Sequence, residues 1–253
     1  MMHKYRSFLF LLAFLGGFTI GVSADSATKA VATTPWTAAF AQAAGLGSVH
    51  VLAPYDLRHP AEYELRPGDV LAVREADILI YAGYERMMER LAGTGQASDQ
   101  KRIQIATSYD MQTLEKSLMA IARAAGTVGQ ATAEVEKIRT FYAAWRAELK
   151  REGLYGAPVL VHFHQQPLAR ELGFEIAGVF GPGPLEAQQI VKLSRQHAAL
   201  CIDNWHNEVA APLKETMPAV TFVSFINFPG KDGTRSIMDV LRYNRNVLKQ
   251  ATE

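Results

Sequence analysis

The stretch Val128–Glu152, VGQATAEVEKIRTFYAAWRAELKRE, decides the architecture of this 253-residue chain. Its apolar residues recur every three or four positions, which predicts an α-helix with one buried face. They are Val128, Ala131, Val135, Ile138, Tyr142, Trp145 and Leu149. Gly153, Gly156 and Pro158 follow and predict where the helix ends. At 1.5 Å per residue the helix is roughly 37 Å long, more than one small lobe needs, so we expect it to connect two lobes.

On both sides of this helix, short apolar runs alternate with helical patterns, which predicts parallel sheets with flanking helices. Strands are expected at Lys29–Thr33, Ser48–Ala53, Asp77–Ala82, Arg102–Ala106, Pro158–Phe163, Phe174–Phe180, Ala199–Asp203 and Ala219–Phe225. Other helices are expected at Trp36–Ala44, Pro67–Glu75, Tyr84–Leu91, Met111–Ala125, Gln165–Leu172, Leu185–His197, Glu208–Met217 and Ser236–Gln250. The predicted fold class is α/β, with two lobes, each a mostly parallel sheet with flanking helices, joined by one long spanning helix. The expected divisions are a leader at 1–24, a lobe at 25–127, the linking helix at 128–153 and a second lobe at 154–253.

The first residues have the three-part layout of a secretory signal peptide. Lys4 and Arg6 precede an uncharged run, Phe8–Ile20, and small residues stand before Asp25. The run is shorter than the roughly 20 residues that a membrane-spanning helix needs. We therefore expect cleavage before Asp25 and a periplasmic mature chain, and without a cysteine at the cleavage point we expect no lipid anchor.

Composition excludes several classes of protein. The net charge of +1, from 26 basic and 25 acidic residues, argues against a nucleic-acid binder. The single cysteine, Cys201, excludes an internal disulfide framework and a cysteine-rich metal site. Metal chemistry in this chain must therefore rest on histidine and carboxylate side chains.

Three histidines, His59, His164 and His206, lie where predicted strands end. Ligands of parallel α/β sheets bind beyond these carboxyl ends, and three converging imidazoles suit Zn²⁺ or a similar ion. We expect the side chains of His162 and His164, two positions apart, to point to opposite faces, with His164 entering the site. Other candidate ligands, or partners that orient the imidazoles, are His162, Asp203, Glu62 and Asn227. His50 and His197, in a predicted strand and a predicted helix, are interpreted as structural or surface residues.

At this point the chain resembles the zinc- and manganese-type solute-binding proteins of bacterial ABC transporters, over nearly all of its mature length. The resemblance rests on Ala30–Pro35 before a helix and Val49–Leu52, on the segments His59–Asp69 and Ala76–Glu85, and on His164-Gln165-Gln166 before a helix that ends in Leu172-Gly173-Phe174. It implies two lobes with one spanning helix and capture of a divalent metal ion in the cleft between them. It also implies delivery to a membrane permease with a cytoplasmic ATPase, by a monomer that is not an enzyme.

The chain departs from the family pattern at two ligand positions. Family members often take a third ligand from the loop that corresponds to Val179–Pro184, which here contains none, so His206 is the expected substitute. The final acidic ligand of the family falls near Asn227, which is a neutral and weaker ligand. Imidazole-rich ligation favours Zn²⁺, and Mn²⁺ is the second choice.

Two other classes of function compete with metal capture. An exported zinc hydrolase could use the His162-Phe163-His164 pair, with Asp203 or Glu62 as the base. The sequence lacks a His-Glu-x-x-His motif, which weakens that interpretation. A binder of organic solutes or an adhesin would make the histidines incidental.

Overall fold

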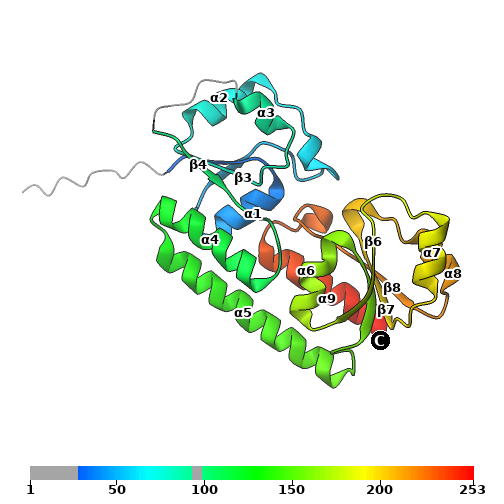
Figure 1. The fold of residues 1–253 in the computed structure, drawn as a ribbon. Coiled ribbons are helices and arrows are strands. Elements are labelled where there is room, and N and C mark those ends of the chain that lie inside the picture. Colours follow the sequence, from blue (N-terminus) through cyan, green and yellow to red (C-terminus); the bar gives the residue numbers. More distant parts are fainter. Residues whose placement is uncertain (1–27, 93–98) are drawn as a thin grey trace, which may run out of the picture.

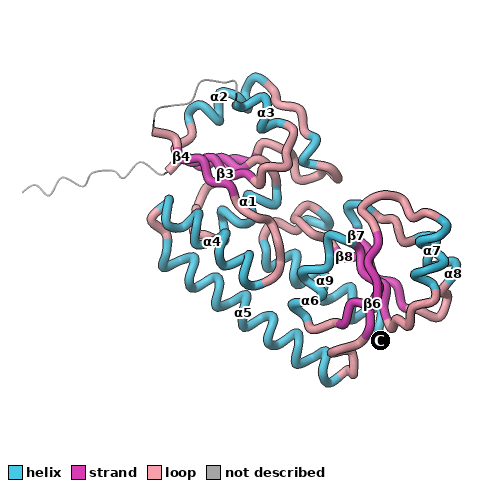
Figure 2. The backbone as a smooth tube through the Cα atoms, in the orientation of Figure 1, coloured by secondary structure: helices cyan, strands magenta, loops and turns pink. Residues whose placement is uncertain are grey.

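The computed structural model describes residues 28–92 and 99–253. The expected signal peptide, 1–24, lies outside the described residues. Two four-stranded parallel sheets form the molecule, with strand orders β2-β1-β3-β4 and β6-β5-β7-β8. Figure 1 shows the two sheets in separate lobes, with the helix α5 running along both, and Figure 2 shows helices on either side of each sheet. The predicted α/β fold with two lobes and one spanning helix is therefore confirmed.

The first lobe is built from the segments before the spanning helix. Its strands and helices are β1 (Ala30–Ala32), α1 (Pro35–Ala43), β2 (Val49–Val51), the 3₁₀ turn η1 (Pro60–Glu62), α2 (Pro67–Glu75), β3 (Ile78–Tyr81), α3 (Met87–Ala92), β4 (Lys101–Gln104) and α4 (Met111–Ala125). The start of α1 follows from local chemistry, because Thr34 and Thr37 form a reciprocal capping box and Pro35 occupies the first turn.

The second lobe follows α5 (Val128–Arg151). Its elements are β5 (Pro158–His162), η2 (Phe163–Gln165), α6 (Gln166–Leu172), β6 (Glu175–Phe180), α7 (Ala187–Ser194), β7 (Leu200–Asn204), η3 (Trp205–Asn207), α8 (Ala211–Thr216), β8 (Thr221–Phe225), η4 (Lys231–Gly233) and α9 (Ile237–Thr252). All eight predicted strands are present, each within one or two residues of the expected start and end. His197 lies beyond the end of α7, in the turn before β7, and not inside a helix as expected.

The helix α5 joins the cores of the two lobes. One continuous apolar cluster contains Phe40 of the first lobe, Tyr142 and Trp145 of α5, and Phe225 of the second lobe. Six of the seven residues of the predicted stripe are buried, and Val128, the first residue of the helix, is exposed. The outer face of each sheet has its own smaller cluster, which α2 and α3 cover in the first lobe and α7 and α8 in the second. The two lobes are thus packed through one shared core.

Candidate metal-binding cavity between the lobes

The carboxyl ends of the strands surround a cavity of about 620 Å³. Its lining comes from loops after β1, β2, β3 and β4 in one lobe and after β5, β7 and β8 in the other. The lining residues are Thr34, Trp36, Arg58, His59, Pro60, Ala61, Glu62, Tyr84, Thr107, His164, Asn204, His206, Asn207, Asn227 and Phe228. All three histidines expected at strand ends, together with Glu62 and Asn227, therefore lie around one cavity.

His59 and Glu62 form part of the wall from the first lobe. His59 is the residue immediately before η1, whose Pro60 is buried and anchors the turn. His59 and Glu62 themselves are exposed. The first lobe thus presents an imidazole and a carboxylate on an accessible loop.

His162 and His164 take different positions in the second lobe. His162 is the last residue of β5, and its Nδ1 accepts a hydrogen bond from the backbone N–H of His164 at 3.1 Å. Its ring is fully buried and packs edge-on against Phe180, with 5.8 Å between the ring centroids. His164 lines the cavity, as expected.

The expectation that the two side chains point to opposite faces is wrong. Residues two apart on a strand share one face, and although the chain turns into η2 after His162, the rings of His162 and His164 lie 5.2 Å apart. Burial lowers the pKa of His162 to about 4, and partial desolvation lowers the pKa of His164. Both imidazoles are therefore neutral at neutral pH.

His206 is held rigidly on the second lobe. It is 4% exposed, and its ring stacks on Phe228 with 3.5 Å between the centroids. The backbone N–H of Asn227 approaches its Nδ1 at 3.5 Å. Burial lowers the pKa of His206 to about 3, so the ring is neutral, which is the form that binds metals.

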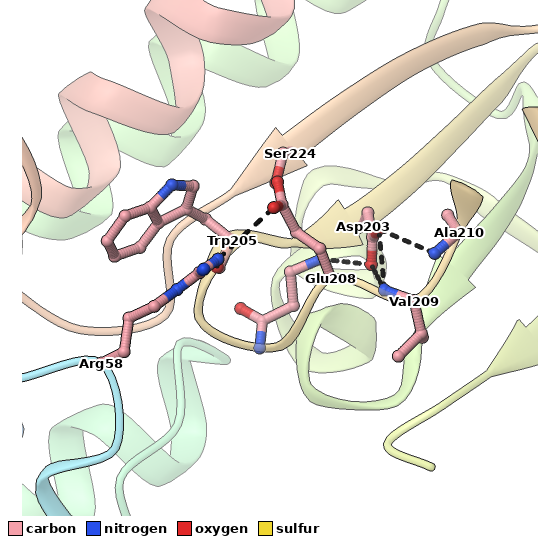
Figure 3. A network of polar contacts seen from close by, with 8 residues as sticks. Arg58, Asp203, Trp205, Glu208, Val209, Ala210 and Ser224 are labelled. Atoms are coloured by element: carbon pink, nitrogen blue, oxygen red, sulfur yellow. Dashed lines mark hydrogen bonds and ion pairs between the residues drawn. The ribbon is translucent and has the colours of Figure 1, made fainter. Parts of the chain in front are cut away.

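Asp203 organises the loop that carries His206 (Figure 3). Its carboxylate accepts hydrogen bonds from the backbone N–H groups of Asn204 at 2.8 Å, Val209 at 3.2 Å and Ala210 at 2.9 Å. Burial raises the pKa of Asp203, and these hydrogen bonds oppose that shift. Asp203 is not among the residues that line the cavity. Its position is that of a support for the loop.

Arg58 crosses from the first lobe to the second beside the cavity. Its guanidinium lies 4.6 Å from the centre of the Trp205 ring and donates a hydrogen bond to the Trp205 carbonyl. It also forms an ion pair at 3.4 Å with Glu208, which accepts a hydrogen bond from Ser224. Figure 3 shows this side chain reaching toward Trp205 and Glu208. We call this set of contacts the Arg58 bridge.

Several residues of the site were not found by sequence reasoning. Arg58 and Trp36 line the cavity through contacts between distant segments, for which the sequence has no local signal. Asn204 ends β7, and the rule that named its neighbour Asp203 could have named it. Buried Gln165 donates hydrogen bonds to Asn204 Oδ1 at 3.1 Å and to the Phe225 carbonyl at 3.3 Å, and so joins the ends of β7 and β8 to η2.

The three histidines line one cavity but do not meet at one point. Within residues 28–92 and 99–253, no group of three or more His, Cys, Asp or Glu side chains is arranged to hold a metal ion. His164, His206 and His59 belong to different loops around the cavity, and Glu62 is the one carboxylate among its described lining residues. In the same part of the chain, no helix has the length and apolar character needed to cross a bilayer.

Comparison with known proteins relates this chain to others through its fold. No protein-family model matches the sequence, and no curated protein matches it either. Among solved structures, the chain is similar to a manganese-bound periplasmic metal-binding protein from Candidatus Liberibacter asiaticus. The TM-score is 0.64 with 16% identity, over 89% of this chain and 100% of that one. A cadmium-bound form of that protein matches with a TM-score of 0.66 and 15% identity, over the same shares of the two chains.

Two proteins from other bacteria have the same architecture. The laminin-binding protein Lbp of Streptococcus pyogenes aligns with a TM-score of 0.63 and 15% identity, over 89% of this chain and 98% of Lbp. A mutant of FpvC from Pseudomonas aeruginosa aligns with a TM-score of 0.65 and 16% identity, over 88% of this chain and 98% of FpvC. At these identities the shared property is the fold.

Proposed function

We propose that this chain is an extracytoplasmic solute-binding protein that captures a divalent metal ion in the cavity between its lobes. In this proposal Zn²⁺ is preferred to Mn²⁺, and the ion is passed to the membrane permease of an ABC transporter with a cytoplasmic ATPase. The protein acts as a binding component and not as an enzyme. The leader at 1–24 would direct it to the periplasm.

The observation that carries this proposal is the placement of His59, His164 and His206 around a single inter-lobe cavity. Burial keeps His206 neutral, and desolvation favours the neutral form of His164, so two of the three imidazoles need lose no proton to bind a cation. Imidazole nitrogen suits Zn²⁺ better than Mn²⁺, which prefers carboxylate oxygen. One periplasmic protein with the same fold has been solved in a manganese-bound and a cadmium-bound form, which supports a divalent cation as the cargo.

The geometry disfavours a hydrolase that uses His162 and His164 as a pair. His162 is fully buried against Phe180 and is not among the residues that line the cavity. Asp203, one of the two bases considered, is engaged by three backbone N–H groups. Neither group is positioned to activate a water molecule in the cavity.

Zinc titration of the mature chain, 25–253, tests the proposal. We expect His59→Ala, His164→Ala and His206→Ala each to weaken zinc binding by about tenfold or more, which is a loss of about 1.4 kcal/mol. His197→Ala is the matched control, because His197 is exposed and does not line the cavity. Unchanged affinity in all three cavity variants would reject the site, and the absence of any bound divalent ion, whether free or chelated, would reject metal capture.

A further inference from the structure

We propose that the cargo is a metal ion held by a small hydroxy- or amino-polycarboxylate chelator, and that the cavity binds the two together. This inference rests on the proposed function and names the chemical form of its substrate. Three features of the cavity carry it: its volume, the incomplete set of metal ligands among the described residues, and the groups on its walls.

The cavity is larger than a bare ion requires. Its volume of about 620 Å³ lies within the range of about 300–1,000 Å³ typical of small-molecule sites. A metal ion bound directly by four side chains fills little space beyond its coordination sphere, and one water molecule takes only about 30 Å³ in the liquid. The remaining space matches an organic molecule with a few carboxyl groups.

The described residues do not complete the coordination of a bare dication. The three imidazoles are separated, and no trio of His, Cys, Asp or Glu in the described chain is clustered to hold an ion. Glu62, the one carboxylate among the described lining residues, is exposed, and the position where an acidic ligand was expected is Asn227. Neutral imidazoles carry no negative charge to offset the two positive charges of the ion, and an uncompensated charge is unfavourable in a partly buried site. A chelator would supply both oxygen ligands and the compensating negative charge.

The cavity walls offer groups that fit such a chelator. Arg58 lines the cavity, and its guanidinium has five N–H donors, which leaves some for a carboxylate while it contacts Trp205. Asn227 is 5% exposed, and its Oδ1 has no hydrogen-bond partner among the described residues. Buried acceptors are normally paired with a donor. After rotation of the Asn227 side chain, a hydroxyl or amino group of the chelator would supply the missing donor. Trp36 and Phe228 provide apolar surface for the carbon skeleton.

Adding citrate should change the apparent zinc affinity in opposite directions for a protein that binds the bare ion and for one that binds the chelated ion. The metal-free mature chain is titrated with zinc alone, with equimolar zinc and citrate, with equimolar zinc and nitrilotriacetate, and with citrate alone. A protein that binds the bare ion must bind zinc more weakly when a chelator competes. We expect the reverse, an apparent affinity at least about tenfold higher with one of the chelators, and a native mass spectrum that contains protein, zinc and chelator together.

Each other outcome contradicts a different statement. Zinc bound alone, with affinity that falls as chelator is added, overturns this inference and leaves the proposed function intact. The absence of zinc from the protein in every titration, whether or not citrate binds, overturns the proposed function as well.

A substitution at Asn227 tests the same inference from the side of the protein. Asn227→Asp would supply the missing carboxylate, so we expect bare zinc to bind more tightly and the enhancement by chelator to disappear. Asn246→Asp is the matched control, because Asn246 is exposed on α9 and lies outside the cavity lining.

Arg58→Gln provides a second test and should reduce the enhancement by citrate at least several-fold. Enhancement that is equal in wild type, Asn227→Asp and Arg58→Gln would overturn the assignment of these walls to the chelator.

Discussion

Single side chains fix the loops that carry the candidate ligands, and Asp203 does so for His206. Residues 204 to 210 leave the sheet without forming a regular helix at once, so their backbone N–H groups need partners. Asp203 supplies oxygen atoms to Asn204, Val209 and Ala210. The carboxylate thus sets the path of the loop, and the loop sets the position of the imidazole.

We predict that Asp203→Ala lowers the free energy of unfolding by about 2–4 kcal/mol, because it leaves buried N–H groups without an acceptor. Asp203→Asn should cost less, since it keeps one acceptor oxygen at the same position. Urea unfolding followed by tryptophan fluorescence measures both losses. If both variants unfold within about 0.5 kcal/mol of the wild type, the carboxylate does not support the loop.

The helix α5 connects the lobes through apolar contacts, and near its end Glu148 adds a polar contact with the second lobe. Glu148 is 8% exposed and forms an ion pair at 2.5 Å with Arg245 of α9. The hydrogen bond and the charge of Arg245 lower the pKa of Glu148 below its usual 4.5. A carboxyl group whose pKa is lower in the folded protein adds stability above its unfolded pKa, and this stability is lost as the pH falls through the folded pKa.

We therefore predict that Glu148→Gln lowers the stability by about 1 kcal/mol at pH 7, and that the difference from the wild type shrinks below about pH 4.5. Urea unfolding between pH 3 and pH 7 measures the difference. Glu136→Gln is the control, because its ion pair with Arg139 on the same helix is exposed and should contribute little. A difference that stays constant across this range would show that the ion pair does not contribute through the ionised carboxylate.

Sequence reasoning succeeded where the information was local and failed where it depended on the packing of the lobes. The pattern of apolar residues was enough to predict α5 and the eight strands, because a helix with one buried face, or a buried strand, leaves that pattern in its own sequence. One local prediction was wrong, because residues two apart on a strand share a face, and the rings of His162 and His164 lie 5.2 Å apart. Arg58 and Trp36 enter the cavity through contacts between segments far apart in the sequence. Their roles follow from how the lobes pack.

At the scale of the whole molecule, one segment of the first lobe is seated directly on the second. Arg58 contacts Trp205, Tyr55 stacks under the guanidinium of Arg235 at 4.1 Å, and Gly230 lies against the Tyr55 backbone. Arg58 lines the cavity, so these contacts lie beside it. The lobes are therefore held together both by α5 and by the segment from Tyr55 to Arg58.

Gly230 is the point where this inter-lobe packing has no room for a side chain. Its φ is +137°, and a Cβ atom there would lie 2.1 Å from the carbonyl oxygen of Tyr55, which is backbone and cannot rotate away. Gly233 also has a positive φ, +78°, but a Cβ atom there would have no neighbour within 4 Å. Alanine at position 230 would clash with Tyr55 of the first lobe, whereas alanine at position 233 would clash with nothing, so the two variants can be compared directly.

We predict that Gly230→Ala lowers the free energy of unfolding by more than Gly233→Ala, whose own cost is roughly 1–2 kcal/mol from its left-handed backbone. Hydrogen exchange separates backbone strain from lobe displacement, because strain at position 230 alone would not alter a segment of the other lobe. We expect faster exchange at residues 55 to 58 in Gly230→Ala and unchanged exchange there in Gly233→Ala. If exchange at this segment is the same in both variants, Tyr55 is not held against the second lobe in solution.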